Sequence, residues 1–97
     1  MPTYVVLYKL TDLGIRNIKE SPKRIEEGIK AVEAAGGKMI GFYSVMGEYD
    51  FVSVREAPND ETAVALALGL GSQGNARTTT LKAFKKEEFV EIVKKLP

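Results

Sequence analysis

Tyr49 and Asp50 are the adjacent residues best suited to acid–base chemistry in this chain. The sequence contains no histidine and no cysteine, which excludes imidazole catalysis, thiolate nucleophiles and thiolate zinc sites. A carboxylate and a phenol are the natural proton-transfer groups that remain, so Asp50 is a candidate general base or ligand anchor and Tyr49 a candidate hydroxyl donor. In the structural alternative, Asp50 accepts hydrogen bonds from turn amides or pairs with an arginine, while the Tyr49 ring packs.

The segment of residues 69–74 reads G-x-G-x-x-G. A dinucleotide-binding fingerprint needs a strand before these glycines and a helix after them, whereas here a helix is expected before them and a strand after. We therefore interpret the segment as a helix end and a loop. One alternative stays open, in which successive backbone N–H groups of the loop bind an anion. Ser72, Asn75 and Arg77 would add donors to that site.

Residues 11–24 form a second candidate anion site, because they are a long connection where about two to six residues usually join a strand to a helix. Arg16 and Asn17 place donors near the start of the expected helix, whose dipole attracts anions. In the alternative interpretation this is a solvated loop that Ile15 and Ile18 attach to the core. The carboxylates are dispersed and lack calcium-loop spacing, so no metal site is expected.

Nucleic-acid binding is not expected from the charge of this chain. Fourteen Lys and Arg against thirteen Asp and Glu give a net charge of +1, whereas phosphate-backbone binding relies on accumulated positive charge. RNA-recognition motifs share the order of elements expected below, but their third strand is basic and contains glycine or alanine between its aromatics. Glu48 and Asp50 stand at those small-residue positions, where they would repel phosphates.

Length and composition are typical of one soluble globular domain spanning residues 1–97. The 97 residues are 44% apolar and 28% charged, and a chain of this size has a thin core. No apolar run reaches the ~20 residues of a membrane helix, and we expect no secretory signal in the first residues. The expectation is a cytoplasmic protein with no membrane contact and no cofactor, which buries further apolar surface by self-association.

Runs of β-branched and aromatic residues predict four strands, at residues 3–10, 38–46, 49–56 and 77–84. Gly47-Glu48 fits a two-residue hairpin turn between the middle strands. Apolar residues at helical spacing predict three helices. The first begins at Ser21 as N-cap and ends at residues 36–37. The second begins at Asn59 and is stopped by Gly69 and Gly71, and the third spans about residues 85–96.

The expected order is β-α-β-β-α-β plus a C-terminal helix, which predicts a ferredoxin-like α+β fold with two helices on one face of an antiparallel sheet. Val64, Ala67 and Leu68 are expected to form the buried side of the second helix. The middle strands have no strictly polar side, so both sheet faces should be partly buried. The last helix can shield a sheet edge but not a face. We expect two sheets to stack in a homodimer or higher homo-oligomer.

Four segments, residues 11–24, 46–50, 55–60 and 67–84, together resemble the GYD-domain family of small prokaryotic proteins. The resemblance covers nearly the whole chain in the right order, although a glutamate interrupts the naming motif at Gly47-Glu48-Tyr49-Asp50. It implies a ferredoxin-like fold of the dimeric α/β-barrel type. On this architecture, relatives bind small molecules or are cofactor-free oxygenases, isomerases or ligand sensors, and the fold alone does not choose among these activities.

We therefore predict an oligomeric domain that binds a small, anionic molecule in a cavity between the sheet and the surrounding elements. One alternative is a cofactor-free isomerase or oxygenase that uses Tyr49 and Asp50, and another is a structural assembly module. An open pocket lined by arginine and asparagine would favour the binding protein, and a completely filled core the module. The candidate ligand-binding residues carry polar groups: Arg16, Asn17, Tyr43, Tyr49, Asp50, Ser72, Asn75 and Arg77.

Overall fold

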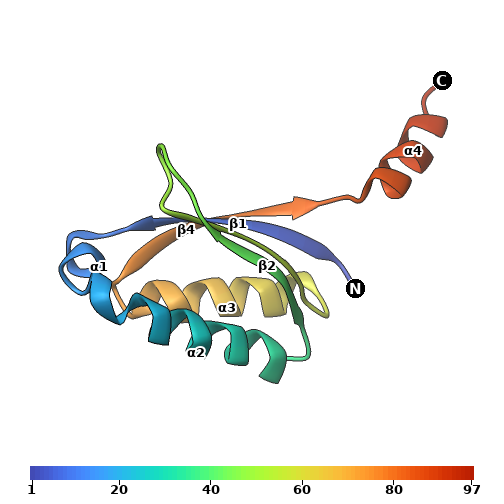
Figure 1. Ribbon diagram of the computed structural model, residues 1–97. Coiled ribbons are helices and arrows are strands. Elements are labelled where there is room, and N and C mark those ends of the chain that lie inside the picture. The colour runs from blue at the N-terminus through green and yellow to red at the C-terminus, as the bar shows by residue number, and fades with distance from the viewer.

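The computed structural model describes all residues, 1–97, as an antiparallel four-stranded sheet with two long helices on one face (Figure 1). The strand order is β2-β3-β1-β4, and every neighbouring pair is antiparallel. This arrangement confirms the ferredoxin-like α+β fold with an extra C-terminal helix. The elements are β1 (Thr3–Leu10), α1 (Asp12–Arg16), a 3₁₀ helix η1 (Ile18–Glu20), α2 (Ser21–Ala34), β2 (Lys38–Ser44), β3 (Phe51–Glu56), α3 (Asp60–Ser72), β4 (Ala76–Ala83) and α4 (Lys86–Lys94).

The connection between β1 and α2 is helical rather than a loop. Thr11 caps α1, because its Oγ1 accepts a hydrogen bond from the backbone N–H of Gly14 at 3.1 Å. A side chain at Gly14 would collide with the carbonyl oxygen of Asn75, so this glycine allows α1 to lie against the start of β4. Because η1 leads directly into α2, Glu20 rather than Ser21 is the N-cap of that helix.

Helix α3 continues through the glycines that were expected to end it. It begins as predicted, since Oδ1 of Asn59 accepts a hydrogen bond from the N–H of Thr62 at 2.9 Å. It ends at Ser72, and the left-handed turn comes at Gly74, where φ is +83°. The glycines inside the helix keep right-handed geometry, because helical propensity penalises glycine without forbidding it.

The predicted buried side of α3 is wrong. Val64 and Leu68 are 57% and 69% exposed, whereas Ala63 is the buried residue of the helix. The apolar residues of α3 are distributed around all sides of the helix. Its sequence therefore has no polar side from which the opposite, buried side could be predicted.

The connection between β2 and β3 is longer than the predicted two-residue turn. Residues 45–50 form a loop whose tip projects from the sheet (Figure 1). The backbone N–H of Val45 donates to the carbonyl of Asp50 at 3.0 Å, which closes the loop around residues 46–49. Gly47 lies within it with φ at +107°.

The hydrophobic core lies between β1 and the two long helices. Tyr4, Val6 and Tyr8 alternate along β1 and are buried beneath α2 and α3, where Val32 and Ala63 complete the core. Only 11 of the 97 residues are buried, so the expectation of a thin core is met.

The other face of the sheet carries no helix. We call it the open sheet face and define it by residues that alternate with the buried ones or pair with them across the strands. These are Val5, Leu7, Tyr43, Val52, Val54 and Leu81. Tyr43 and Leu81 are 58% and 48% exposed.

Helix α4 lies beyond the end of β4, away from the sheet and from α2 and α3 (Figure 1). The molecule extends over 52 × 30 × 19 Å with a radius of gyration of 14.7 Å, whereas a compact domain of this size has about 13 Å. Within one chain α4 therefore does not shield the sheet edge that it was expected to cover. None of the helices combines the length and the apolar character needed to cross a membrane.

Candidate functional site

A cleft of about 390 Å³ lies between α2, α3 and the helix-covered face of the sheet. Small residues on the facing sides of the helices leave this space, among them Gly28 and Ala31 on α2 and Ala65 and Gly69 on α3. A Cβ atom at Gly28 or Gly69 would meet no other atom within 4 Å. The cleft therefore follows from side chains too small to fill the gap between two helices that lie on one sheet.

Three aromatic rings from three strands line the sheet side of the cleft. The ring centroids of Phe42 and Phe51 are 5.3 Å apart, and those of Tyr8 and Phe42 are 5.4 Å apart. Tyr8 and Phe51 meet edge to face at 6.4 Å. The Tyr8 hydroxyl hydrogen-bonds to Oγ of Ser53 at 2.8 Å, so its polar end is satisfied inside the sheet. These three packed rings form an apolar surface on the sheet side of the cleft, which we call the aromatic wall.

Arg55 on β3 is the buried charged residue of the cleft. Only 5% of its surface is exposed, and its Nε atom has no hydrogen-bond partner. None of the four ion pairs in the molecule includes Arg55. Its cross-strand neighbours are Tyr4 and Met39, neither of which carries a negative charge. Burial lowers the pKa of Arg55 below the usual value for arginine.

Arg24 also lines the cleft, but its guanidinium group is already bound. Its Nη2 donates to the backbone carbonyl of Asn17 at 2.7 Å, and its Nη1 pairs with Glu20 at 3.2 Å. Arg24 therefore has its guanidinium group bound within the chain, whereas Nε of Arg55 has no partner.

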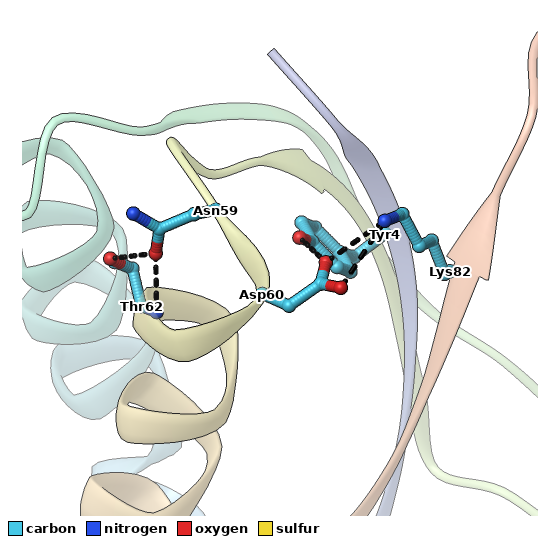
Figure 2. A network of polar contacts seen from close by, with 5 residues as sticks. All are labelled: Tyr4, Asn59, Asp60, Thr62 and Lys82. Carbon is cyan, nitrogen blue, oxygen red and sulfur yellow. Dashed lines mark hydrogen bonds and ion pairs between the residues drawn. The ribbon is translucent and has the colours of Figure 1, made fainter.

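A polar network ties the start of α3 to β1 and β4 (Figure 2). The Tyr4 hydroxyl donates to Asp60 at 2.5 Å, and Nζ of Lys82 lies 3.1 Å from the same carboxylate. The hydrogen bond to Asp60 is the main cause that raises the pKa of Tyr4 to about 12. The same bond, with help from Lys82, lowers the pKa of Asp60. With both partners of Asp60 inside the chain, the network acts as a structural tie.

Asp50 and Tyr49 do not line the cleft. Oδ2 of Asp50 accepts a hydrogen bond from the backbone N–H of Leu10 at 2.8 Å, which attaches the 45–50 loop to the end of β1. Tyr49 is half-buried in the same loop. A catalytic role for this pair stays a prediction.

Residues 69–72 belong to α3, so most of the segment predicted to be an anion-binding loop is helical, and amides at its end donate to helix carbonyls. The N–H groups of Gln73 and Gly74 donate to the carbonyls of Leu70 and Gly71. Oγ of Ser72 likewise donates to the carbonyl of Gly69 at 2.8 Å.

The donors suggested for that loop do not share one site. Ser72 and Arg77 border a separate hollow of about 400 Å³ between α3 and β4. Asn75 lines the cleft, and its buried Oδ1 has no hydrogen-bond partner. Among the predicted ligand-binding residues, Asn75 is therefore the one that reaches the cleft.

The remaining candidates lie elsewhere on the molecule. Arg16 is exposed at the end of α1, and Asn17 contributes its backbone carbonyl to Arg24. Ile15 and Ile18 are 54% and 44% exposed, so they do not attach this segment to the core as the alternative interpretation expected. Tyr43 lies on the open sheet face with its ring over Gly41, where a Cβ atom would come within 2.8 Å of the Tyr43 hydroxyl.

Sequence reasoning missed the main cleft residues, Tyr8, Phe42, Phe51 and Arg55. A signal for Arg55 was nevertheless present, since it alternates with Phe51 and Ser53 along β3 and therefore shares their buried face. Arginine is rare on a buried face unless its charge is paired, so this position could have indicated a functional residue.

Comparison with known proteins places this arrangement in a family. A family model described as "GYD domain" matches residues 4–93. The chain belongs to the GYD domain family. A Thermus thermophilus protein named "Glutamine synthetase and cystathionine beta-lyase binding protein" is 37% identical over 95 residues, which are 97% of this chain and 100% of that relative.

Two crystal structures share the fold. TTHA0845 from Thermus thermophilus is similar with a TM-score of 0.56 and 25% identity, over 88% of this chain and 95% of that one. The leucine response regulatory protein LrpA of Mycobacterium tuberculosis is similar with a TM-score of 0.57 and 16% identity, over 88% of this chain. This GYD domain spans about half of the mycobacterial chain, at 51%. The similarity to LrpA therefore concerns the fold alone.

Proposed function

We propose that this GYD domain is a homo-oligomeric binding protein that attaches to another protein. The observation that carries the proposal is α4, a helix without a covering element on any side. Phe89, Ile92 and Val93 are 59%, 41% and 43% exposed. They recur at helical spacing, which gives α4 an apolar stripe of the kind that docks onto another surface.

The Thermus thermophilus relative supports an enzyme as the partner. Its name states that it binds glutamine synthetase and cystathionine beta-lyase, and the match spans both chains almost completely. We extend this class of partner to the present chain and expect it to bind one or both enzymes without catalysing a reaction itself. A cytoplasmic location stays a prediction of this proposal.

In this proposal the open sheet face and the apolar stripe of α4 bind different partners. The open sheet face binds a second copy of the chain, because a flat apolar face can pair with itself about a two-fold axis. Helix α4 is separate from that face and binds the enzyme. Glutamates and lysines border its apolar stripe and would form the polar rim of the interface.

The experiment mixes the protein with purified glutamine synthetase or cystathionine beta-lyase of Thermus thermophilus and measures binding by calorimetry. We expect micromolar binding to at least one enzyme, and a loss of at least about tenfold in Phe89→Asp, because a charge enters the apolar stripe. The matched control is Val64→Asp, which changes an exposed valine on α3. If the unchanged protein binds neither enzyme, the proposed partner class is wrong. If Phe89→Asp loses self-association instead, α4 belongs to the interface between copies.

A second candidate function is the binding of a small molecule in the cleft. Its volume of about 390 Å³ lies within the range of ligand pockets, and its walls are mainly apolar with a few polar groups. Arg24, Arg55 and Asn75 line it, which is the combination expected for a binding protein. No comparable observation favours a cofactor-free enzyme, because Tyr49 and Asp50 lie outside the cleft.

A further inference from the structure

We propose that Arg55 anchors an anion in the cleft and that the ligand is a small carboxylate with an apolar body. The inference deepens the small-molecule function proposed above and does not depend on the protein partner. It begins from the side chain of Arg55, whose buried Nε has no hydrogen-bond partner. A guanidinium group has five N–H donors and keeps its charge in proteins, so its burial normally comes with an anion or several acceptors.

The acidic side chains near Arg55 in the fold are occupied or exposed. Asp60 is bound to Tyr4, the cross-strand neighbour of Arg55, and to Lys82. Glu56, the next residue along β3, pairs with Lys85 at 3.7 Å. Glu27 on α2 also lines the cleft, but it is exposed and forms no ion pair. An anion that enters the cleft would therefore meet a guanidinium that nothing in the chain neutralises.

The topology gives the cleft a polar end and an apolar length. Antiparallel pairing places Arg55 opposite Tyr4, and Phe51 opposite Tyr8 further along the same strands. The carboxylate end of a ligand would lie at Arg55, and its body would extend along the aromatic wall. Gly28 and Gly69 leave room on the helix side.

A carboxylate fits Arg55 better than a spherical anion does, because the planar guanidinium fork can donate two parallel hydrogen bonds to its two oxygens. The aromatic wall favours a flat apolar group next to that carboxylate. Phenylacetate combines both features and serves as the probe. Phenylacetamide has the same shape without the charge.

The test measures the binding of both probes by chemical-shift changes of the protein. We expect phenylacetate to bind at least about tenfold more tightly than phenylacetamide. In Arg55→Met this preference should disappear while phenylacetamide binding is retained. Arg16→Met is the matched control, since Arg16 is an exposed arginine that does not line the cleft, and we expect less than about a threefold change there.

A second variant covers the case in which Arg55→Met does not fold. Arg55→Lys keeps the positive charge and loses the fork, so it should weaken phenylacetate severalfold and leave phenylacetamide unchanged. Equal affinities of the two probes for the unchanged protein would overturn the anion site while leaving a small-molecule function intact. If neither probe binds at millimolar concentration, both the anion site and the proposed small-molecule function are wrong.

Discussion

At the scale of single residues, the Tyr4–Asp60 pair shows how one hydrogen bond controls two protonation states. Tyr4 donates to Asp60, so the bond needs a neutral phenol and is strongest with a charged carboxylate. This requirement raises the pKa of Tyr4 to about 12 and lowers the pKa of Asp60. The pair therefore stabilises the folded protein across neutral pH and weakens toward both extremes.

We predict that the contribution of Tyr4 to stability is lost at alkaline pH. An unfolded tyrosine has a pKa of about 10, and the folded value is higher, so the contribution is complete below pH ~10 and declines as the pH rises toward about 12. The urea midpoint of the unchanged protein should therefore exceed that of Tyr4→Phe by a constant amount up to pH ~10 and by less above it. Tyr43→Phe, on the open sheet face, is the control. A difference that does not change up to pH ~12 would contradict this role.

The acid side has the opposite sign. The pKa of Asp60 is lowered in the folded protein, so its contribution is complete above the unfolded value of about 4 and is lost as the pH falls below it. Asp60→Asn should therefore approach the stability of the unchanged protein in acid and differ from it most at neutral pH. Urea denaturation from about pH 7 down to about pH 3 measures this convergence.

At the scale of elements, Asp50 connects the 45–50 loop to the end of β1 through its carboxylate and the N–H of Leu10. We expect Asp50→Ala to lower the free energy of unfolding by about 1 kcal/mol, because the part-buried backbone N–H of Leu10 loses its acceptor. Asp50→Asn keeps an acceptor oxygen and should lose less. An unchanged unfolding free energy in Asp50→Ala would refute the structural role and would favour a functional role for Asp50.

At the scale of the whole molecule, the exposed apolar surface predicts self-association. The open sheet face presents side chains that contribute roughly 1.5–3 kcal/mol each when fully buried. We expect light scattering at micromolar concentration to give a mass of at least two chains of 10.6 kDa. Leu81→Asp should shift this mass toward one chain, while Val64→Asp on α3 should not. A mass near 10.6 kDa that persists as the unchanged protein is concentrated would overturn the oligomer.

The sequence by itself determined the order of the elements and the class of the fold. Strand runs such as residues 3–10, the cap at Asn59 and the glycines at residues 36–37 act over a few neighbouring positions. Such local preferences can be found without knowledge of distant contacts. Together with the rules for connecting strands they leave few topologies, and the ferredoxin-like one was among them.

Only the tertiary structure decided where the cleft lies and which residues line it. Tyr8, Phe42 and Arg55 come from three strands, and antiparallel pairing places them on one face. The space beside them exists because small residues on α2 face small residues on α3, and nothing in either helix alone shows that the two will meet. The position of α4 could not be predicted from the sequence either, because its apolar stripe indicates that the helix packs against another surface but not which one. Whether a polar group is satisfied depends on residues far away in the chain, so the unpaired Nε donor of Arg55 became visible only in the folded molecule.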